Sequence, residues 1–164
     1  MNASYACIVG IAIMPPTMAL YSASKFALEG ACESLWYEVR PWGIRVSLVE
    51  PGFIHSDSFG RTRYTPESER GMSDPANPYH LHYQHMASFI ARLMTAARAT
   101  PDDLARKILS VMAHPNPPLR VPATLDAHFF HLLRRVLPRR FYHWVLYRSL
   151  PGVRGWGAGT KVAS

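Results

Sequence analysis

Residues 21–52, YSASKFALEGACESLWYEVRPWGIRVSLVEPG, decide the fold. The first part of this stretch repeats apolar side chains at helical spacing, at Leu28, Ala31, Leu35 and Val39. Pro41-Trp42-Gly43 is a sequence that ends a helix. Residues 44–49 are then rich in apolar and β-branched side chains and stop at Pro51-Gly52, which predicts a strand buried on both faces of a parallel sheet.

Upstream of this helix, residues 6–10 have the apolar run of a short buried strand, although a helix fragment would show the same pattern. Pro15 and Pro16 interrupt any regular structure and predict a loop of about five residues before Tyr21. A strand, a helix and a second strand in this order form a βαβ unit with a right-handed crossover.

The rest of the chain alternates loops and helices. Residues 56–77 have no apolar period and predict an irregular loop of a length that is typical of lids and binding segments. Thr100-Pro101-Asp102-Asp103 has the cap, proline and acidic residues of a helix start. The other predicted elements are a helix over 78–99, the capped helix to Ala113, a last strand over 119–122, and helices over 125–137 and 139–150.

Tyr21 and Lys25 carry the first chemical signal. They are four residues apart and therefore lie on the same face of a helix, one turn apart. A tyrosine hydroxyl has an ordinary pKa of about 10, and a nearby ammonium favours the phenolate, which suits the hydroxyl for proton transfer. An exposed tyrosine and lysine on a solvated helix face would show the same spacing.

The context of the pair decides between these interpretations. Residues 21–30, YSASKFALEG, followed by residues 43–54, GIRVSLVEPGFI, closely resemble the second half of a short-chain dehydrogenase/reductase. The resemblance covers about residues 11–60. It implies hydride transfer between a nicotinamide cofactor, NAD or NADP, and an alcohol or a carbonyl compound. It also implies a partial Rossmann-like, doubly wound parallel sheet of the α/β class, without its N-terminal strands.

The resemblance also assigns roles to individual residues. Tyr21 would pass a proton to or from the substrate oxygen, and Lys25 would lower the pKa of that tyrosine and hold the nicotinamide ribose. Pro51 and Gly52 would end the strand at the carboxyl edge of the sheet, where ligands bind in such folds. The backbone at Ile54 and the hydroxyl of Ser56 would face the nicotinamide amide.

Two features of the family have no counterpart. The family carries a serine about thirteen residues before the tyrosine, where this chain has Ile8, and losing one oxyanion donor typically costs about 10²–10³ in rate. The glycine-rich turn that receives the pyrophosphate does not occur before Tyr21. We therefore expect a truncated dehydrogenase whose strand at 44–49 would be central, with one sheet edge left as an unpaired apolar ladder. Gly155-Trp156-Gly157-Ala158-Gly159 predicts a flexible tail.

Composition limits the alternatives. The chain has 164 residues, two cysteines and a net charge of +7, which suits one domain with a real core and no disulfide framework. It has no run of 18 uncharged apolar residues, so we expect no membrane-spanning helix. The apolar stretch 5–14 lacks the preceding basic residue of a signal peptide, and we expect a cytoplasmic protein. His80, His82 and His85 have no acidic residue near them, so we expect a polar helix face and no metal site.

The C-terminal part is distinct in charge. Residues 119–164 hold eight basic side chains and one acidic one, whereas residues 1–118 hold ten of each. We expect a partial dehydrogenase domain over 1–122, with a substrate loop at about 56–77, and a basic, aromatic-rich helical tail over 123–164. The arginines and aromatic residues of this tail fit an element that lies on an anionic membrane surface. A helical arm over the substrate cleft with solvated arginines fits as well, and no nucleic-acid-binding module is present.

Two functions follow from the sequence. The first is an NAD(P)-dependent oxidoreductase that acts on a small hydrophobic alcohol or ketone, peripheral to the membrane if the tail binds there. The second is a non-catalytic remnant of the family that acts as an association or membrane-surface module. Exposed apolar edges would favour a homo-oligomer in either case.

Overall fold

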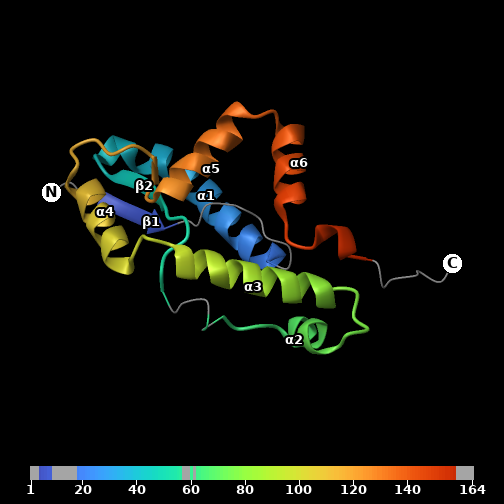
Figure 1. The fold of residues 1–164 in the computed structure, drawn as a ribbon. Coiled ribbons are helices and arrows are strands. Elements are labelled where there is room, and N and C mark those ends of the chain that lie inside the picture. The colour runs from blue at the N-terminus through green and yellow to red at the C-terminus, as the bar shows by residue number, and fades with distance from the viewer. Residues whose placement is uncertain (1–3, 9–17, 57–59, 61, 158–164) are drawn as a thin grey trace.

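The computed structural model describes residues 4–8, 18–56, 60 and 62–157, and it is an α/β fold with a small parallel sheet (Figure 1). The strands are β1 (Ser4–Ile8), β2 (Arg45–Glu50) and β3 (Arg120–Pro122). The α-helices are α1 (Ala19–Val39), α2 (Pro66–Ser73), α3 (His80–Ala96), α4 (Pro101–Ala113), α5 (Leu125–Val136) and α6 (Arg139–Ser149). Two short 3-10 helices, η1 (Arg40–Trp42) and η3 (Val153–Gly155), complete the described elements.

The sheet has the order β1-β2-β3, and both pairs of strands are parallel. Tyr5 pairs with Val46, and Leu48 pairs with Arg120. The predicted central position of the strand at 44–49 is therefore confirmed within the described sheet, where β1 and β3 are the edges.

The core lies on both faces of β2. Val46 and Leu48 are buried on one face against Cys32 of α1. Val49 is buried on the other face against Val111 of α4 and Val121 of β3. Figure 1 shows the strands between α4 and α1. Each fully buried aliphatic side chain of this kind stabilises the fold by about 1.5–3 kcal/mol, so the apolar run predicted as doubly buried holds the layers together.

The end of α1 agrees with the sequence. The helix runs into η1, and Gly43 follows with a φ of 72°, a left-handed conformation that glycine adopts without steric cost. Its amide donates a hydrogen bond of 3.0 Å to the carbonyl of Arg40. The proline, tryptophan and glycine after Arg40 thus turn the chain from α1 into β2.

One prediction is wrong: residues 56–77 are not irregular throughout, because α2 forms within them. Thr65 caps this helix by accepting a hydrogen bond from the Ser68 amide, and Pro66 occupies the first helical position. Glu67 and Glu69 lie in the first turn, where negative charge is favourable. These start signals account for a short helix here, although the segment has no apolar stripe.

The helix predicted over 78–99 is shorter than expected. It spans His80–Ala96, and Ala97 already has an extended backbone. Thr100 caps α4 in an extended conformation, and the residue before a proline is disfavoured in a helix. The start of α4 therefore keeps the preceding residues out of α3.

The glycine-rich end is also more ordered than predicted, as far as residue 157. The indole of Trp156 donates a hydrogen bond of 3.1 Å to Nδ1 of His85, and its ring lies 4.5 Å from the ring of His82. A side chain at Gly152 would overlap the His85 ring. Residues 153–157 thus lie against α3, while residues 158–159 fall outside the described part.

Candidate functional site

The fold brings the two predicted parts of the site to one edge of the sheet. The end of α1 at Val39 is separated from the start of β2 at Arg45 by a few residues, so α1 runs antiparallel to β2. The start of α1 therefore lies toward the carboxyl end of β2, which is followed by Pro51 and Gly52. In open α/β sheets ligands bind at this edge.

Tyr21 and Lys25 lie on the same face of α1, as their spacing predicted. Lys25 Nζ is 5.5 Å from the centroid of the Tyr21 ring, and half of the Tyr21 surface is exposed. The hydroxyl of Ser24 donates a 2.7 Å hydrogen bond to the Tyr21 carbonyl. An exposed phenol and an ammonium this close can share a ligand at the edge of the sheet.

Pro51 and Gly52 lead into a loop that α5 holds in place. The amide of Gly52 donates to Thr124 Oγ1 at 2.9 Å, and the amide of Phe53 donates to Asp126 Oδ2 at 2.7 Å. A Cβ atom at Gly52 would overlap the carboxylate of Asp126. Glycine is therefore required at position 52 because the first turn of α5 approaches the backbone closely.

The next amides of this loop differ in their partners. The amide of His55 donates to the carbonyl of Ala99 at 2.8 Å. The amide of Ile54 forms no hydrogen bond with any residue in the described ranges. Ser56, the last of the predicted site residues, lies at the end of the same described stretch. Among the amides of residues 52–55, the one at Ile54 is therefore available to a ligand as far as the described residues show.

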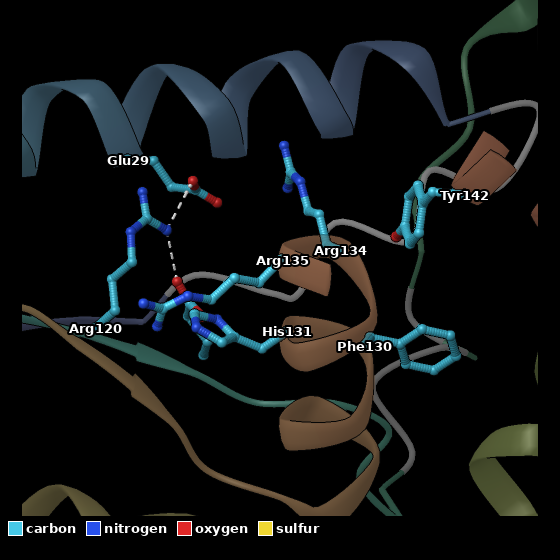
Figure 2. A pocket seen from close by; sticks show the side chains of 8 residues that line it. Glu29, Arg120, Phe130, His131, Arg134, Arg135 and Tyr142 are labelled. Atoms are coloured by element: carbon cyan, nitrogen blue, oxygen red, sulfur yellow. Dashed lines mark hydrogen bonds and ion pairs between the residues drawn. The ribbon is translucent and has the colours of Figure 1, made fainter. Parts of the chain in front are cut away.

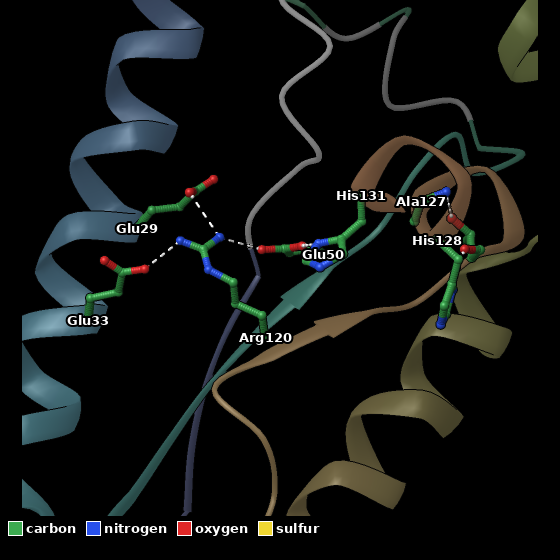
Figure 3. A network of polar contacts seen from close by, with 8 residues as sticks. Glu29, Glu33, Glu50, Arg120, Ala127, His128 and His131 are labelled. Carbon is green, nitrogen blue, oxygen red and sulfur yellow. Dashed lines mark hydrogen bonds and ion pairs between the residues drawn. The ribbon is translucent and has the colours of Figure 1, made fainter. Parts of the chain in front are cut away.

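A polar network lies beside this loop, at the last residue of β2 (Figure 3). Arg120 contacts three carboxylates: Nη1 is 2.7 Å from Glu50 and 3.1 Å from Glu29, and Nη2 is 2.6 Å from Glu33. His131 Nδ1 lies 3.6 Å from the other oxygen of Glu50. The network joins α1, β2, β3 and α5.

The network also explains how a charge is accommodated in the core. The Glu50 side chain is only 6% exposed, whereas that of Arg120 is 32% exposed. Burial alone would lower the pKa of Arg120, but the hydrogen bonds that Arg120 donates to Glu33, Glu50 and Glu29 outweigh it and raise the pKa above its ordinary value. Arg120 therefore stays charged and compensates the buried carboxylate.

Comparisons with known proteins place the chain in a family. The model of the short chain dehydrogenase family matches residues 6–67. The human 17-beta-hydroxysteroid dehydrogenase type 1 is 35% identical over 115 residues, which cover 70% of this chain and 34% of that protein. The chain belongs to the short-chain dehydrogenase/reductase family.

Other members of the short-chain dehydrogenase/reductase family match a larger share of the chain. The uncharacterized oxidoreductase YbbO of Escherichia coli K12 is 32% identical over 136 residues, which cover 82% of this chain and 44% of that protein. A solved short-chain dehydrogenase/reductase from Burkholderia phymatum, in complex with NAD, superimposes with a TM-score of 0.62 at 22% identity. That match covers 82% of this chain and 47% of the solved one, so the chain spans less than half the length of these relatives.

Several residues around the family's predicted site were not singled out from the sequence. Thr124 and Asp126 accept the hydrogen bonds that hold the loop after Gly52. In the sequence they form a helix start, with Thr124 as the cap and an acidic residue two positions later. The buried carboxylate of Glu50 pairs with Arg120, and its signal in the sequence was an acidic residue directly after the apolar residues Leu48 and Val49. A buried charge of this kind requires a partner, but the sequence does not say which one.

The histidines of α3 serve packing and hydrogen bonding. His85 accepts the Trp156 hydrogen bond, the His82 ring contacts the same indole at a tilt of 33°, and His80 Nε2 is 2.9 Å from the amide nitrogen of Gln84. Within the described ranges no group of three histidine, cysteine or acidic side chains is placed to hold a metal ion. In the same part of the chain no helix is long and apolar enough to cross a membrane.

Proposed function

We propose that this chain carries the proton-transferring side of an NAD(P)-dependent short-chain dehydrogenase/reductase that interconverts a hydrophobic alcohol and its carbonyl compound. The observation that carries the proposal is the pairing of Tyr21 and Lys25 toward the edge where β2 ends. Lys25 Nζ lies 5.5 Å from the centroid of the Tyr21 ring. The unclaimed amide of Ile54 follows that strand. Together they offer a proton donor, a positive charge and a backbone donor to ligands at one edge.

The residues present fit the nicotinamide end of the cofactor. A ribose hydroxyl accepts hydrogen bonds from an ammonium, which Lys25 supplies, and a carboxamide oxygen accepts one from a backbone amide, which Ile54 supplies. Ser56 would add a hydroxyl beside that carboxamide. The cofactor, when bound, supplies the acceptor or donor of the hydride.

The protein's own part in the reaction is to move the proton. The Tyr21 hydroxyl would give its proton to the substrate oxygen during reduction and take it back during oxidation. The positive charge of Lys25 would favour the anionic form of that hydroxyl while the proton is on the substrate. Half-exposed Tyr21 is accessible to a substrate that approaches from solvent.

A hydrophobic substrate is supported by one relative and by the surface of the chain. The human relative acts as a 17-beta-hydroxysteroid dehydrogenase, and a hydroxysteroid is an apolar alcohol. In this chain Leu20, next to Tyr21 in α1, exposes apolar surface. We therefore place an apolar alcohol or ketone among the first substrates to test.

Replacing Tyr21 by phenylalanine tests the proposal. Reduction of a panel of hydrophobic ketones by NADH or NADPH should fall by about 10²-fold or more, since loss of a general acid typically costs that much. Tyr37→Phe is the matched control, because this tyrosine lies on the same helix and is 70% exposed. Turnover that survives Tyr21→Phe, or falls equally in both variants, would contradict the role of Tyr21.

A second candidate function is binding to an anionic membrane surface. Leu125, Phe129, Leu132 and Val136 are exposed on α5 at spacings of three and four residues, which places them on one face. Arg134 and Arg135 lie in the last turn of the same helix. A helix with an exposed apolar face and adjacent cations binds at the boundary of anionic lipid headgroups and acyl chains.

Sedimentation with vesicles tests this second candidate. The chain should sediment with phosphatidylserine-containing vesicles and stay in the supernatant with purely zwitterionic ones. Leu132→Ser should reduce sedimentation, whereas Leu109→Ser on α4, at a similarly exposed leucine, should not. Equal recovery in the supernatant with both lipids would exclude the membrane role.

A further inference from the structure

A cavity of about 260 Å³ lies between α1 and the two helices of the tail (Figure 2). It is lined by Glu29, Glu50, Arg120, Phe130, His131, Arg134, Arg135 and Tyr142. Glu29 is eight residues beyond Tyr21, which corresponds to about 12 Å along the helix axis. The cavity therefore lies farther along α1 than Tyr21, with Lys25 one helical turn before Glu29.

The two carboxylates in this lining share the guanidinium of Arg120, which also contacts Glu33. Glu29 and Glu50 both contact Nη1 of Arg120, and His131 lies beside the second oxygen of Glu50. Figure 2 shows the contacts of Arg120 at one side of the cavity. Arg120 is thus engaged by carboxylates of the protein, and a ligand anion in the cavity has to bind to other cations of the lining.

Two positive charges in the lining are not compensated in this way. Arg134 and Arg135 are solvent-exposed, and neither lies within 4.0 Å of an acidic side chain in the described part of the chain. The guanidinium of Arg134 lies 5.5 Å from the centroid of the Phe26 ring. An arginine placed on an aromatic face still has its edge donors free, and these bind a carboxylate in a bidentate manner.

The remaining walls are aromatic, with one hydroxyl. Tyr142 is buried, and Figure 2 shows its hydroxyl directed toward the helix that carries Arg134. Burial raises the pKa of Tyr142, while the charge of Arg134 acts in the opposite direction. The hydroxyl therefore keeps its proton at neutral pH and can donate a hydrogen bond. Phe130 adds an apolar surface next to it.

We propose that this cavity binds the anionic end of a small amphipathic ligand, a carboxylate attached to an apolar body. Arg134 and Arg135 bind the carboxylate, Tyr142 donates a third hydrogen bond, and Phe130 contacts the apolar part. Its volume is just below the roughly 300–1,000 Å³ of typical small-molecule sites, so the ligand is compact. The site does not depend on hydride transfer at Tyr21.

Calorimetric titration of the full chain with a matched pair of probes tests the proposal. We expect 4-phenylbutyrate to bind at least about tenfold more tightly than 4-phenylbutanol, which has the same apolar body without the charge. Inorganic phosphate should bind more weakly than the acid, because it lacks the apolar body. Equal binding of acid and alcohol, equal binding of acid and phosphate, or no binding of the acid would overturn the proposal.

Variants then locate the site. Arg134→Gln with Arg135→Gln should abolish the preference for the acid, and Tyr142→Phe should weaken the acid a few-fold. Arg139→Gln with Arg140→Gln removes the same charge from the next helix and should leave the preference intact. An equal loss in this control pair would overturn the proposal, since it would show an effect of net charge alone. If the Arg134→Gln, Arg135→Gln variant does not fold, two measurements test the proposal instead. They are the comparison of acid and alcohol on the unchanged chain and the loss of acid binding in Tyr142→Phe.

Discussion

Replacing Arg120 by methionine should strongly destabilise the protein, because it leaves a buried carboxylate without its cation. Arg120 is 2.7 Å from Glu50, whose side chain is 6% exposed. Removing one partner of a fully buried pair costs about 3–5 kcal/mol. This cost is smaller here, because Arg120 itself is one third exposed and its contact with the half-exposed Glu33 adds little to stability. We therefore expect a loss of about 2–3 kcal/mol in the free energy of unfolding.

Urea unfolding followed by circular dichroism measures this loss. Arg106→Met is the matched control, because Arg106 pairs with an exposed carboxylate, and it should cost about 0.5 kcal/mol or less. Adding Glu50→Gln to Arg120→Met should recover part of the loss, since it removes the uncompensated charge.

Two results would refute this reasoning about the network. The first is a loss in Arg120→Met no larger than that in Arg106→Met. The second is a double variant in which Glu50→Gln adds to the loss caused by Arg120→Met. Either result would mean that Glu50 is solvated or compensated without Arg120.

Two further predictions concern local structure. Gly52→Ala should cost about 1–3 kcal/mol of stability in thermal unfolding, because the new Cβ overlaps Asp126. Gly30→Ala is the control: its Cβ has open space in α1, and it should stabilise the protein by up to about 1 kcal/mol. A Gly52→Ala variant as stable as the unchanged protein would argue against the close approach of α5. The backbone amide of Thr100, then its hydroxyl, lowers the pKa of Asp103 to about 2. The ionised Asp103 carboxylate stabilises the protein above its unfolded pKa of about 4, and this stabilisation should be lost as the pH falls to about 2. The stability of Asp103→Asn should not show this loss over the same pH range.

The sequence predicted the elements whose signals are local. The helix before Pro41 and the strand before Pro51 were predicted because periodicity and punctuation lie within the same few residues. The pairing of Tyr21 and Lys25 was predictable for the same reason, since helical geometry alone places them together. Their catalytic roles stay predictions, because they depend on ligands.

The missed features depend on weak or distant signals. The helix after Thr65 has the same start signal as the helix after Thr100, but no apolar stripe, so its composition indicated a loop. Arg120 is 70 residues from Glu50 and 91 from Glu29, and no local pattern joins residues so far apart. The amide of Ile54 has no partner among the described residues, because tertiary contacts engage the amides on both sides of it, and no local sequence pattern shows this.

Titration with reduced nicotinamide cofactor tests most directly the claim that Tyr21, Lys25 and the loop after β2 form a nicotinamide site. We expect a saturable rise in the fluorescence of NADH or NADPH as the cofactor is titrated. Lys25→Met should weaken it, whereas Lys107→Met on α4 should leave it unchanged. No change in fluorescence at millimolar cofactor, or an equal effect of both lysine variants, would contradict the account.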